Sequence, residues 1–301
     1  MKVGLRTPAM LEALLVTFLW SSSYILIKIG LQDVSPLTFS ALRYSLAFAI
    51  LLVLSSASRQ REARPALSSQ EWVMLIAAGA CGYAVAQGLQ FVGLYYLPAV
   101  TVSFLLNFTP IFALVLGATF LDEKPTGIQL VGIIVALVGA YAYFLTSVLL
   151  NEFLAVSIVL VSGLGWAAYM IIVRDLQRVG KIGTFHLTTA SMGVGAAILL
   201  ASALAGEGLP SITLQGWGVI IWLSLVNTAL AFYLWNHALK GIRAYELSVL
   251  QNTMLVQIAI LASIFLGEEL TVNKVFGIVL VLFGITLVQI RRRQQDRTID
   301  R

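Results

Sequence analysis

The chain has 301 residues, of which 59% are hydrophobic and only 11% are charged. Soluble domains carry about 25% charged residues, so this composition excludes a soluble globular protein and indicates a polytopic membrane protein. The net charge of +5 does not indicate nucleic-acid binding, because the basic residues lie in loops and at the C-terminal end, and the single cysteine, Cys81, excludes an intramolecular disulfide.

Apolar runs long enough to cross a bilayer follow one another along the whole chain. A transmembrane helix needs about 20 mostly apolar residues. Ten segments meet this requirement: roughly 8–30, 36–54, 72–97, 99–121, 127–146, 152–173, 184–205, 214–238, 244–266 and 273–290. The first run is too long for the apolar core of a signal peptide and meets no clear cleavage site, so we expect a retained helix. The sequence therefore predicts an all-α polytopic membrane protein with ten transmembrane helices.

The second half of the chain repeats the first. A shift of 145 positions brings an identical residue onto each of Ala99, Ser103, Leu105, Asn107, Phe120, Glu123, Thr126, Gly132 and Gly139. We therefore divide the chain into a five-helix repeat at 1–147 and a second at 148–301, which ends in a basic tail. Because five is an odd number, the second repeat must enter the membrane from the opposite side. Such inverted repeats are typical of secondary transporters, whose substrate site lies near the midplane between the halves.

The distribution of Lys and Arg predicts the orientation. If the N-terminus is cytoplasmic, only Lys28 and Lys274 fall on the outer side and Arg43 falls inside the second helix, while the other 16 of the 19 basic residues face the cytoplasm. Cytoplasmic loops carry the excess of Lys and Arg in membrane proteins. We therefore expect a multi-pass protein of the cell inner (cytoplasmic) membrane, with both termini in the cytoplasm and the lipid bilayer as its surroundings.

Several short motifs stand at characteristic places along the predicted helices. They are Leu19-Trp20-Ser21-Ser22-Ser23-Tyr24 with Lys28, Ser35-Pro36-Leu37 with Arg43, Thr109-Pro110-Ile111-Phe112 through Asp122-Glu123, Gln129-Leu130-Val131-Gly132, and Gly267-Glu268-Glu269. With these motifs the chain resembles the drug/metabolite transporter superfamily, specifically its ten-helix EamA-type members. The resemblance implies export of small metabolites or drugs from the cytoplasm, with no ATP-binding domain and no cofactor.

Two positions depart from the pattern that the resemblance implies. Leu255 stands where the first repeat has Pro110, so only the fourth helix is expected to be kinked. Related four-helix multidrug exporters hold a carboxylate within the first helix, whereas Trp20 occupies the middle of that helix here and Glu12 lies close to its cytoplasmic edge. Proton coupling through a buried carboxylate is therefore not expected.

Aromatic and amide side chains stand in the interior of several predicted helices. Polar groups are disfavoured in lipid, so they should point into the bundle. Each amide has an alternative role as a hydrogen bond between helices, and each aromatic ring has one in core packing. Taken as a set, they predict a substrate-binding cavity lined by Trp20, Tyr24, Tyr83, Gln87, Asn107, Trp166, Tyr169, Asn227 and Asn252.

Other residues are assigned gating or structural roles. Arg43 lies about two turns into the second helix from the outer surface, where it either serves function or pairs structurally near the interface. Pro110 removes a helical hydrogen bond and marks a hinge or a cavity wall. Gly132 and Gly139, with their copies Gly277 and Gly284, predict close helix packing within the chain or in a dimer. The carboxylates at Asp122-Glu123 and Glu268-Glu269 are expected to cap helix starts.

The residues favour one function over three others. The predicted lining offers aromatic faces and uncharged amides, which suit neutral or aromatic amino acids exported by alternating access. A multidrug or cationic-compound exporter is the first alternative. A membrane-embedded lipid-modifying enzyme or a channel would belong to another class, but no cluster at metal-ligand spacing, phosphate loop or selectivity filter is present. We therefore expect no enzyme activity and no metal; monomer and homodimer remain open.

Overall fold

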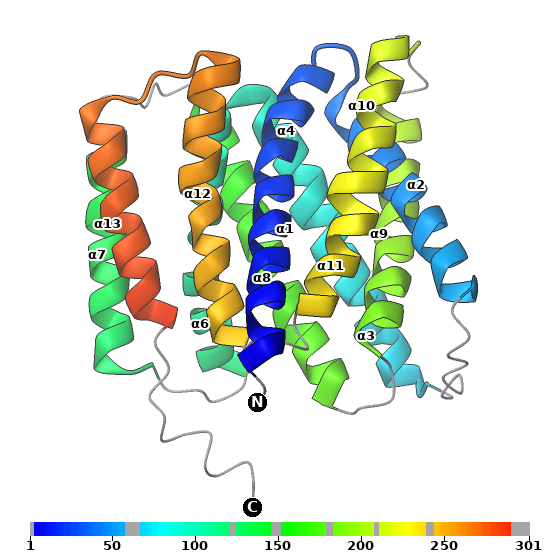
Figure 1. The fold of residues 1–301 in the computed structure, drawn as a ribbon, viewed down its shortest axis with the longest axis horizontal. Coiled ribbons are helices and arrows are strands. Elements are labelled where there is room, and N and C mark those ends of the chain that lie inside the picture. The colour runs from blue at the N-terminus through cyan, green and yellow to red at the C-terminus, as the bar shows by residue number, and fades with distance from the viewer. Residues whose placement is uncertain are drawn as a thin grey trace, which may run out of the picture.

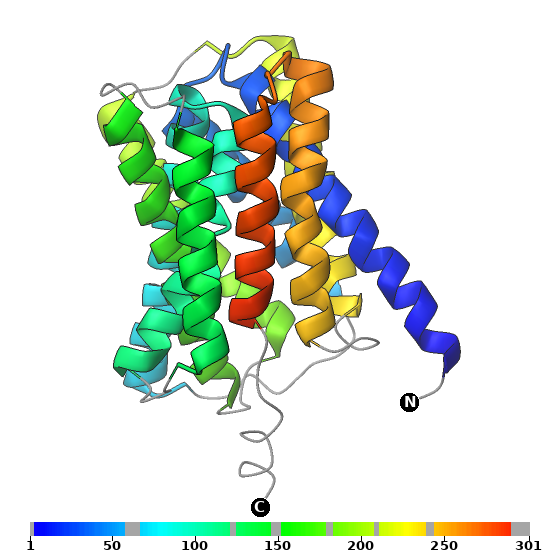
Figure 2. The ribbon, with the colours of Figure 1, turned by 90° about the vertical axis from the view of Figure 1, so that its left-hand side faces the viewer.

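The computed structural model describes residues 3–57, 67–120, 125–145, 152–178, 183–207, 211–238 and 244–289. Within these ranges the chain is a bundle of helices that run roughly side by side (Figures 1 and 2). The first five crossings are formed by α1 (Val3–Gly30), α2 (Pro36–Ala57), α3 (Ser69–Gly79) with η1 (Ala80–Gln87) and α4 (Gly88–Tyr96), α5 (Ala99–Leu106) with α6 (Thr109–Phe120), and α7 (Gly127–Phe144).

The second five crossings follow the same order. They are formed by α8 (Phe153–Arg178), α9 (Thr184–Gly206), α10 (Leu214–Ser224) with η3 (Leu225–Leu230) and α11 (Ala231–Ala238), α12 (Ala244–Leu266), and α13 (Val272–Gln289). Among the described residues, nine helical stretches are long and apolar enough to span a membrane, and α12 adds the shorter apolar stretch Leu250–Leu266. The prediction of ten transmembrane helices in two repeats is confirmed.

The two repeats interrupt their third helix at the same place. Residues 80–87 of the third crossing form a π-helix, and the π-helix of the eighth crossing begins at Leu225, which is 145 positions after Ala80. A π-helix loosens the regular i to i−4 ladder and is frequent at functional sites. The fourth crossing also breaks, between α5 and α6 just before Pro110, whereas α12 runs through Leu255 without interruption. Pro110 predicted the break in the fourth crossing, and Leu255 at the equivalent position predicted an unbroken α12.

The helices α7 and α13 reveal the symmetry between the repeats. They pack closely because glycines face each other at two points: a Cβ on Gly284 would lie 2.6 Å from the carbonyl oxygen of Gly132, and one on Gly139 would lie 3.0 Å from that of Gly277. The shift of 145 converts the first contact into the second. A twofold axis between α7 and α13 therefore relates the repeats, and these glycines serve packing within one chain.

The remaining helices pair across the repeats in the same manner. Along its length α2 packs on α9, which is its counterpart in the second repeat, and α1 packs on α12 as α8 packs on α5 and α6. α1 begins and α13 ends at the same end of the bundle (Figure 1), which we call the terminal end; the opposite end is the far end. Helices of the first repeat therefore pack directly against helices of the second repeat throughout the bundle.

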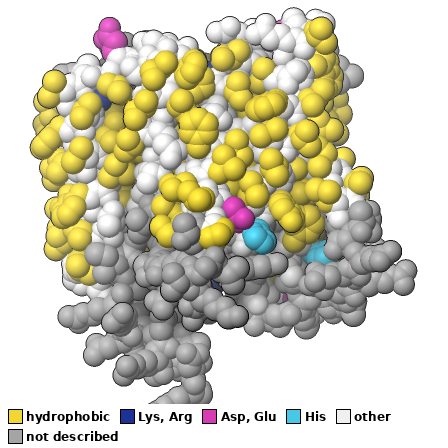
Figure 3. Space-filling view, viewed as in Figure 1, with side chains coloured by type: hydrophobic (Ala, Val, Ile, Leu, Met, Phe, Trp, Pro, Cys, Tyr) yellow, Lys and Arg dark blue, Asp and Glu magenta, His cyan; other side chains and the backbone are white. Residues whose placement is uncertain are grey.

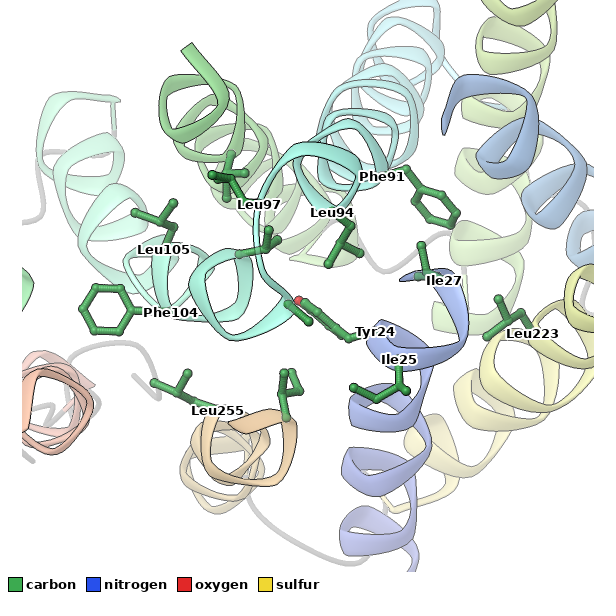
Figure 4. Close-up of a cluster of buried hydrophobic side chains, with 14 of the residues drawn as sticks. Tyr24, Ile25, Ile27, Phe91, Leu94, Leu97, Phe104, Leu105, Leu223 and Leu255 are labelled. Carbon is green, nitrogen blue, oxygen red and sulfur yellow. The ribbon is translucent and has the colours of Figure 1, made fainter. Parts of the chain in front are cut away.

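Buried apolar side chains fill the space between the helices. Figure 4 shows Tyr24, Ile25 and Ile27 of α1 facing side chains from α4, α5, α10 and α12. These residues belong to one large buried cluster that draws on both repeats. Many large apolar side chains are also exposed on the outside of the helices, and they cover most of the described face in Figure 3. A surface of this kind suits contact with lipid rather than with water.

Candidate functional site

Three carboxylates join the repeats at the far end of the bundle. Asp33 follows α1, Glu207 ends α9 and Glu268 follows α12, and each accepts hydrogen bonds from an element of the other repeat. We call these hydrogen bonds the far-end contacts. Because charged acceptors make hydrogen bonds about twice as strong as neutral pairs do, the far-end contacts hold the two repeats together at this end.

Glu207 caps the start of α2. The first helical residue is Pro36, which has no N–H, so the first free donors are the backbone N–H groups of Leu37 and Thr38. Glu207 accepts both, at 3.2 and 2.7 Å, together with the hydroxyls of Ser35 at 2.6 Å and Thr38 at 2.8 Å. Partial burial favours the neutral acid, but these four hydrogen bonds outweigh it and lower the pKa of the Glu207 carboxyl.

Glu268 and Asp33 act at two other helix starts. Glu268 accepts the backbone N–H groups of Ala99 at 2.6 Å and Val100 at 3.0 Å, which are the first donors of α5. Asp33 accepts the backbone N–H and the hydroxyl of Thr213, the residue that caps α10, at 3.0 and 2.7 Å. The capping that was predicted for Glu268 is thus present, and it connects different repeats. Asp122 and Glu123 lie outside the described residues.

Arg43 lies deeper, about 10 Å along α2 from Pro36, and only 5% of its surface is exposed. Its Nε donates to the hydroxyl of Thr228 in η3 at 3.0 Å, and that hydroxyl in turn donates to the carbonyl oxygen of Leu223 at 2.8 Å. The Arg43 guanidinium also lies 5.4 Å from the ring centre of Tyr44 and 5.8 Å from that of Phe91. Arg43 thus links the second helix of one repeat to the π-helix of the other.

The charge of Arg43 is not matched by a carboxylate among the described residues. Removing an ion from water costs several kcal/mol in a protein, whereas a desolvated cation–π contact returns only about 2 kcal/mol. One neutral hydroxyl and two rings therefore leave the guanidinium undercompensated. An ionisable group within the membrane that lacks a partner of opposite charge is a candidate for binding a ligand.

A row of aromatic rings extends from Arg43 across the first repeat and into the second. Tyr44 packs edge-on against Tyr83 of η1, with ring centres 5.6 Å apart. Tyr83 packs in the same way against Tyr169 of α8, with ring centres 5.7 Å apart, and Tyr169 stacks on Trp166, with ring centres 4.9 Å apart. We call these four residues the aromatic row. Gln87 joins it by accepting a hydrogen bond from the Tyr44 hydroxyl at 2.7 Å. The structure therefore brings four residues of the predicted lining together, Tyr83, Gln87, Trp166 and Tyr169.

Asn227 and Trp20 form a second group, between α1 and the eighth crossing. The amide nitrogen of Asn227 donates to the carbonyl oxygen of Leu19 and to the hydroxyl of Ser22 at 3.1 Å. Its Oδ1 is buried and has no hydrogen-bond partner within the described part of the chain. Trp20 packs on Trp235 at 4.9 Å and on Phe232 at 5.8 Å, both in α11. This group adjoins Arg43 through the neighbouring residue Thr228.

The other residues of the predicted lining differ in their surroundings. Tyr24 is buried in the main apolar cluster (Figure 4) and lies close enough to Arg43 and Tyr44 to interact with both electrostatically. Asn107 is half-buried and donates to the carbonyl oxygen of Ser103 in its own helix at 2.9 Å. Asn252 donates instead to Gln289 of α13 at 2.8 Å. The two equivalent asparagines thus have different partners, and among the described residues neither is hydrogen-bonded to the aromatic row or to Arg43.

Sequence patterns did not identify three residues of this region as site residues. Tyr44, Phe91 and Thr228 contact Arg43, but each looks like an ordinary residue of an apolar helix. Under the shift of 145, Thr228 corresponds to Tyr83, so the repeat itself offered one signal. The described residues contain no group of three or more His, Cys, Asp or Glu side chains that could hold a metal ion. What the region presents is a buried cation, aromatic faces and amides.

Comparisons with known proteins match this architecture. The model of the EamA-like transporter family matches residues 7–145 and again residues 153–290. An uncharacterized transporter of Archaeoglobus fulgidus is 28% identical, over 93% of this chain and 98% of its own length. A solved crystal structure has the same fold, with a TM-score of 0.69 at 16% identity over 94% of this chain and 98% of its own.

Two further relatives have names that state a substrate. A probable amino-acid metabolite efflux pump of Salmonella typhimurium is 27% identical over 91% of this chain and 92% of its own length. A probable terminal-alkyne amino-acid exporter of Streptantibioticus cattleyicolor is 24% identical over 93% of each chain. Because the family model matches nearly the whole chain, in both repeats, the chain belongs to the EamA-like transporter family and is a transporter, not an enzyme.

Proposed function

We propose that this protein exports neutral or aromatic amino acids from the cytoplasm by alternating access. The observation that carries the proposal is the set of far-end contacts, in which carboxylates from both repeats close one end of a twofold-related bundle. Two similar halves can rock about a site between them. Breaking the far-end contacts would then open the far end, and the halves would close at the terminal end.

The proposed substrate class rests on the chemistry around Arg43 and the aromatic row. Aromatic faces can stack on a flat apolar side chain, and the amides of Gln87 and Asn227 can meet amino or carboxylate groups. Two relatives are named as exporters of amino-acid compounds, which agrees with this chemistry. We place the binding site at Trp20, Tyr24, Tyr83, Gln87, Trp166, Tyr169 and Asn227, with Asn107 and Asn252 at its margin.

A cationic drug fits this region poorly. The acidic side chains that can be described within the apolar spans stand near helix ends, and two of them are engaged: Glu12 contacts His237 at 2.8 Å, and Glu71 caps the start of α3. The buried charge that lies deeper, about 10 Å along α2 from Pro36, is instead the cation Arg43. A positively charged substrate would be repelled by this group and would lack a carboxylate to bind.

We place the protein in the inner (cytoplasmic) membrane of the cell, with the terminal end of the bundle facing the cytoplasm. Lys28 and Lys274 lie toward the far end, while in the sequence most other Lys and Arg residues stand between or beyond helix ends that lie at the terminal end. Reporter fusions after Arg301 and in the loop near Glu207 test this orientation. A reporter at Arg301 that is active only outside the cell would contradict it.

Transport by purified protein tests the function. In proteoliposomes we expect saturable uptake of radiolabelled phenylalanine and leucine down their gradients, and overexpression in cells should raise tolerance to toxic amino-acid analogues. A nucleobase, a nucleotide sugar and a dicationic dye serve as controls. Saturable transport of one of the controls, with no movement of amino acids, would overturn the substrate class.

A further inference from the structure

We propose that Arg43 is the anchor for the carboxylate of the transported molecule, and that this anchor is a binding group rather than a structural one. The proposal rests on the proposed function for the identity of the substrate, and it goes beyond that function by assigning one side chain to one chemical group. The residues of the predicted lining supply rings and amides, which do not by themselves select an anion.

Arg43 has more hydrogen-bond donors than it has partners among the described residues. A guanidinium has five N–H donors. Among the described residues only the Nε donor of Arg43 has a hydrogen-bond partner, the hydroxyl of Thr228. The four donors on the two Nη atoms are therefore left over, and they form the planar fork that binds a carboxylate through two parallel hydrogen bonds.

Arg43 is held in place by uncharged groups. Its backbone carbonyl oxygen accepts a hydrogen bond from the Ser224 hydroxyl at 3.0 Å, and its Nε is fixed by Thr228. Both partners belong to the eighth crossing, on either side of the start of η3. The rings of Tyr44 and Phe91 flank the guanidinium. The side chain is thus preorganised by neutral groups, with its charge left for a ligand.

The residue next to Thr228, Asn227, offers a hydrogen-bond acceptor that no described residue uses. The Oδ1 atom of Asn227 is a buried acceptor without a partner in the described part of the chain, while its Nδ2 is held by α1. Asn227 thus offers an acceptor next to Thr228, the residue that binds Arg43. An acceptor near a cation is complementary to a zwitterion, which carries an ammonium donor beside its carboxylate. An amino acid has both groups on one carbon atom.

The aromatic surroundings specify what the carboxylate is attached to. Phe91 and the aromatic row present ring faces and edges to the same region. A phosphate or a sugar would find few polar partners there, whereas a carboxylate on an apolar or aromatic stem would match both the charge and the rings. The anchor therefore selects carboxylates with apolar stems.

The test pairs changes in the protein with changes in the ligand. Binding of phenylalanine, of 3-phenylpropanoate (which keeps the carboxylate but lacks the amine) and of phenethylamine (which keeps the amine but lacks the carboxylate) is measured on purified wild type, Arg43→Met and Arg43→Lys. We expect wild type to bind phenethylamine about tenfold or more weakly than phenylalanine, because a buried anchor left unpaired strongly rejects a ligand lacking its partner group. Arg43→Met should lose that preference, and Arg43→Lys should restore part of it.

A structural role for Arg43 would give a different pattern. If Arg43→Met weakens phenylalanine and phenethylamine by the same factor, or if wild type binds the two equally well, the anchor is refuted. Wild-type protein alone supplies the second comparison, so the test survives a variant that does not fold.

Failure of the proposed function can be told apart from failure of the anchor. If neither phenylalanine nor leucine is transported, the substrate class is wrong. The anchor is then judged by thermal stabilisation with 3-phenylpropanoate, which should raise the melting temperature of wild type but not that of Arg43→Met. Equal stabilisation of the two proteins, or none of wild type, would overturn the anchor as well.

Discussion

The Nε atom of Arg43 and the hydroxyl of Thr228 are 3.0 Å apart, and their hydrogen bond joins the two repeats deeper in the bundle than the far-end contacts do. Arg43 lies in the second helix of the first repeat, and Thr228 lies in the π-helix of the eighth crossing. The π-helix matters because it shifts the register of the helix locally, and Thr228 uses its own proton on the carbonyl of Leu223, five residues earlier. Its oxygen is thus oriented to accept from Arg43.

Replacing Thr228 with valine removes this acceptor while keeping the volume of the side chain. We expect Thr228→Val to lower the stability of the purified protein by about 1–3 kcal/mol, because a buried charged donor is left without its partner. Thr286→Val is the matched control, since the exposed Thr286 hydroxyl bonds only within its own helix, to Leu282 at 2.7 Å. Thermal melting compares the two, and equal effects would contradict the role given to Thr228.

The contact between α7 and α13 predicts a second difference. Gly284→Ala places a Cβ 2.6 Å from both the carbonyl oxygen of Gly132 and the backbone nitrogen of Ala136, so the helices must move apart. The expected loss of stability is about 1–3 kcal/mol, as for overpacked cores. Gly218→Ala in α10 is the control, because nothing lies within 4 Å of its Cβ and alanine favours a helix by up to about 1 kcal/mol. Loss of stability in the control alone would contradict the packing.

Much of the fold can be read from the sequence, because its signals are local or periodic. The apolar runs give the crossings, Pro110 gives the break in the fourth helix, and the pairs related by 145 positions give the inversion. The repeat also marked Gly132 and Gly284, although the sequence did not show that these two glycines face each other within one chain.

The site was harder to predict, because its contacts join distant parts of the chain. Tyr83 and Tyr169 are expected to point into the bundle, and both are buried. The sequence does not predict the partner of Asn252, because it is Gln289 on a different helix. No propensity marks the π-helices, since Ala80–Gln87 reads as an ordinary helical segment. Nothing in the sequence marks Thr228 as the partner of Arg43, because the two residues lie on helices of different repeats.

The far-end contacts predict that the stability of the folded protein depends on pH. Hydrogen bonds from Ser35, Leu37 and Thr38 lower the pKa of Glu207 in the folded protein, even though partial burial opposes them. Its contribution to stability is therefore fully present above the ordinary glutamate pKa of 4.5 and is lost as pH falls below that value. Wild type should lose stability over this acidic range more steeply than Glu207→Gln does.

A neighbouring carboxylate provides the control for the pH experiment. Glu269 lies at the same end of the bundle but is exposed. Glu269→Gln should therefore follow the wild-type curve in melting experiments between about pH 6 and pH 3.5. If Glu207→Gln and wild type give parallel curves, the capping of α2 by an ionised Glu207 does not contribute to stability.

The central claim is that the two repeats separate at the far end during each transport cycle. The most direct measurement is phenylalanine counterflow in proteoliposomes by a variant that carries Leu37→Cys and Glu207→Cys in a Cys81→Ala background, before and after linking the two thiols with a reversible bifunctional reagent. The account predicts that counterflow is present before linking, is abolished by the link and returns on reduction. Counterflow that continues unchanged in fully linked protein would contradict it.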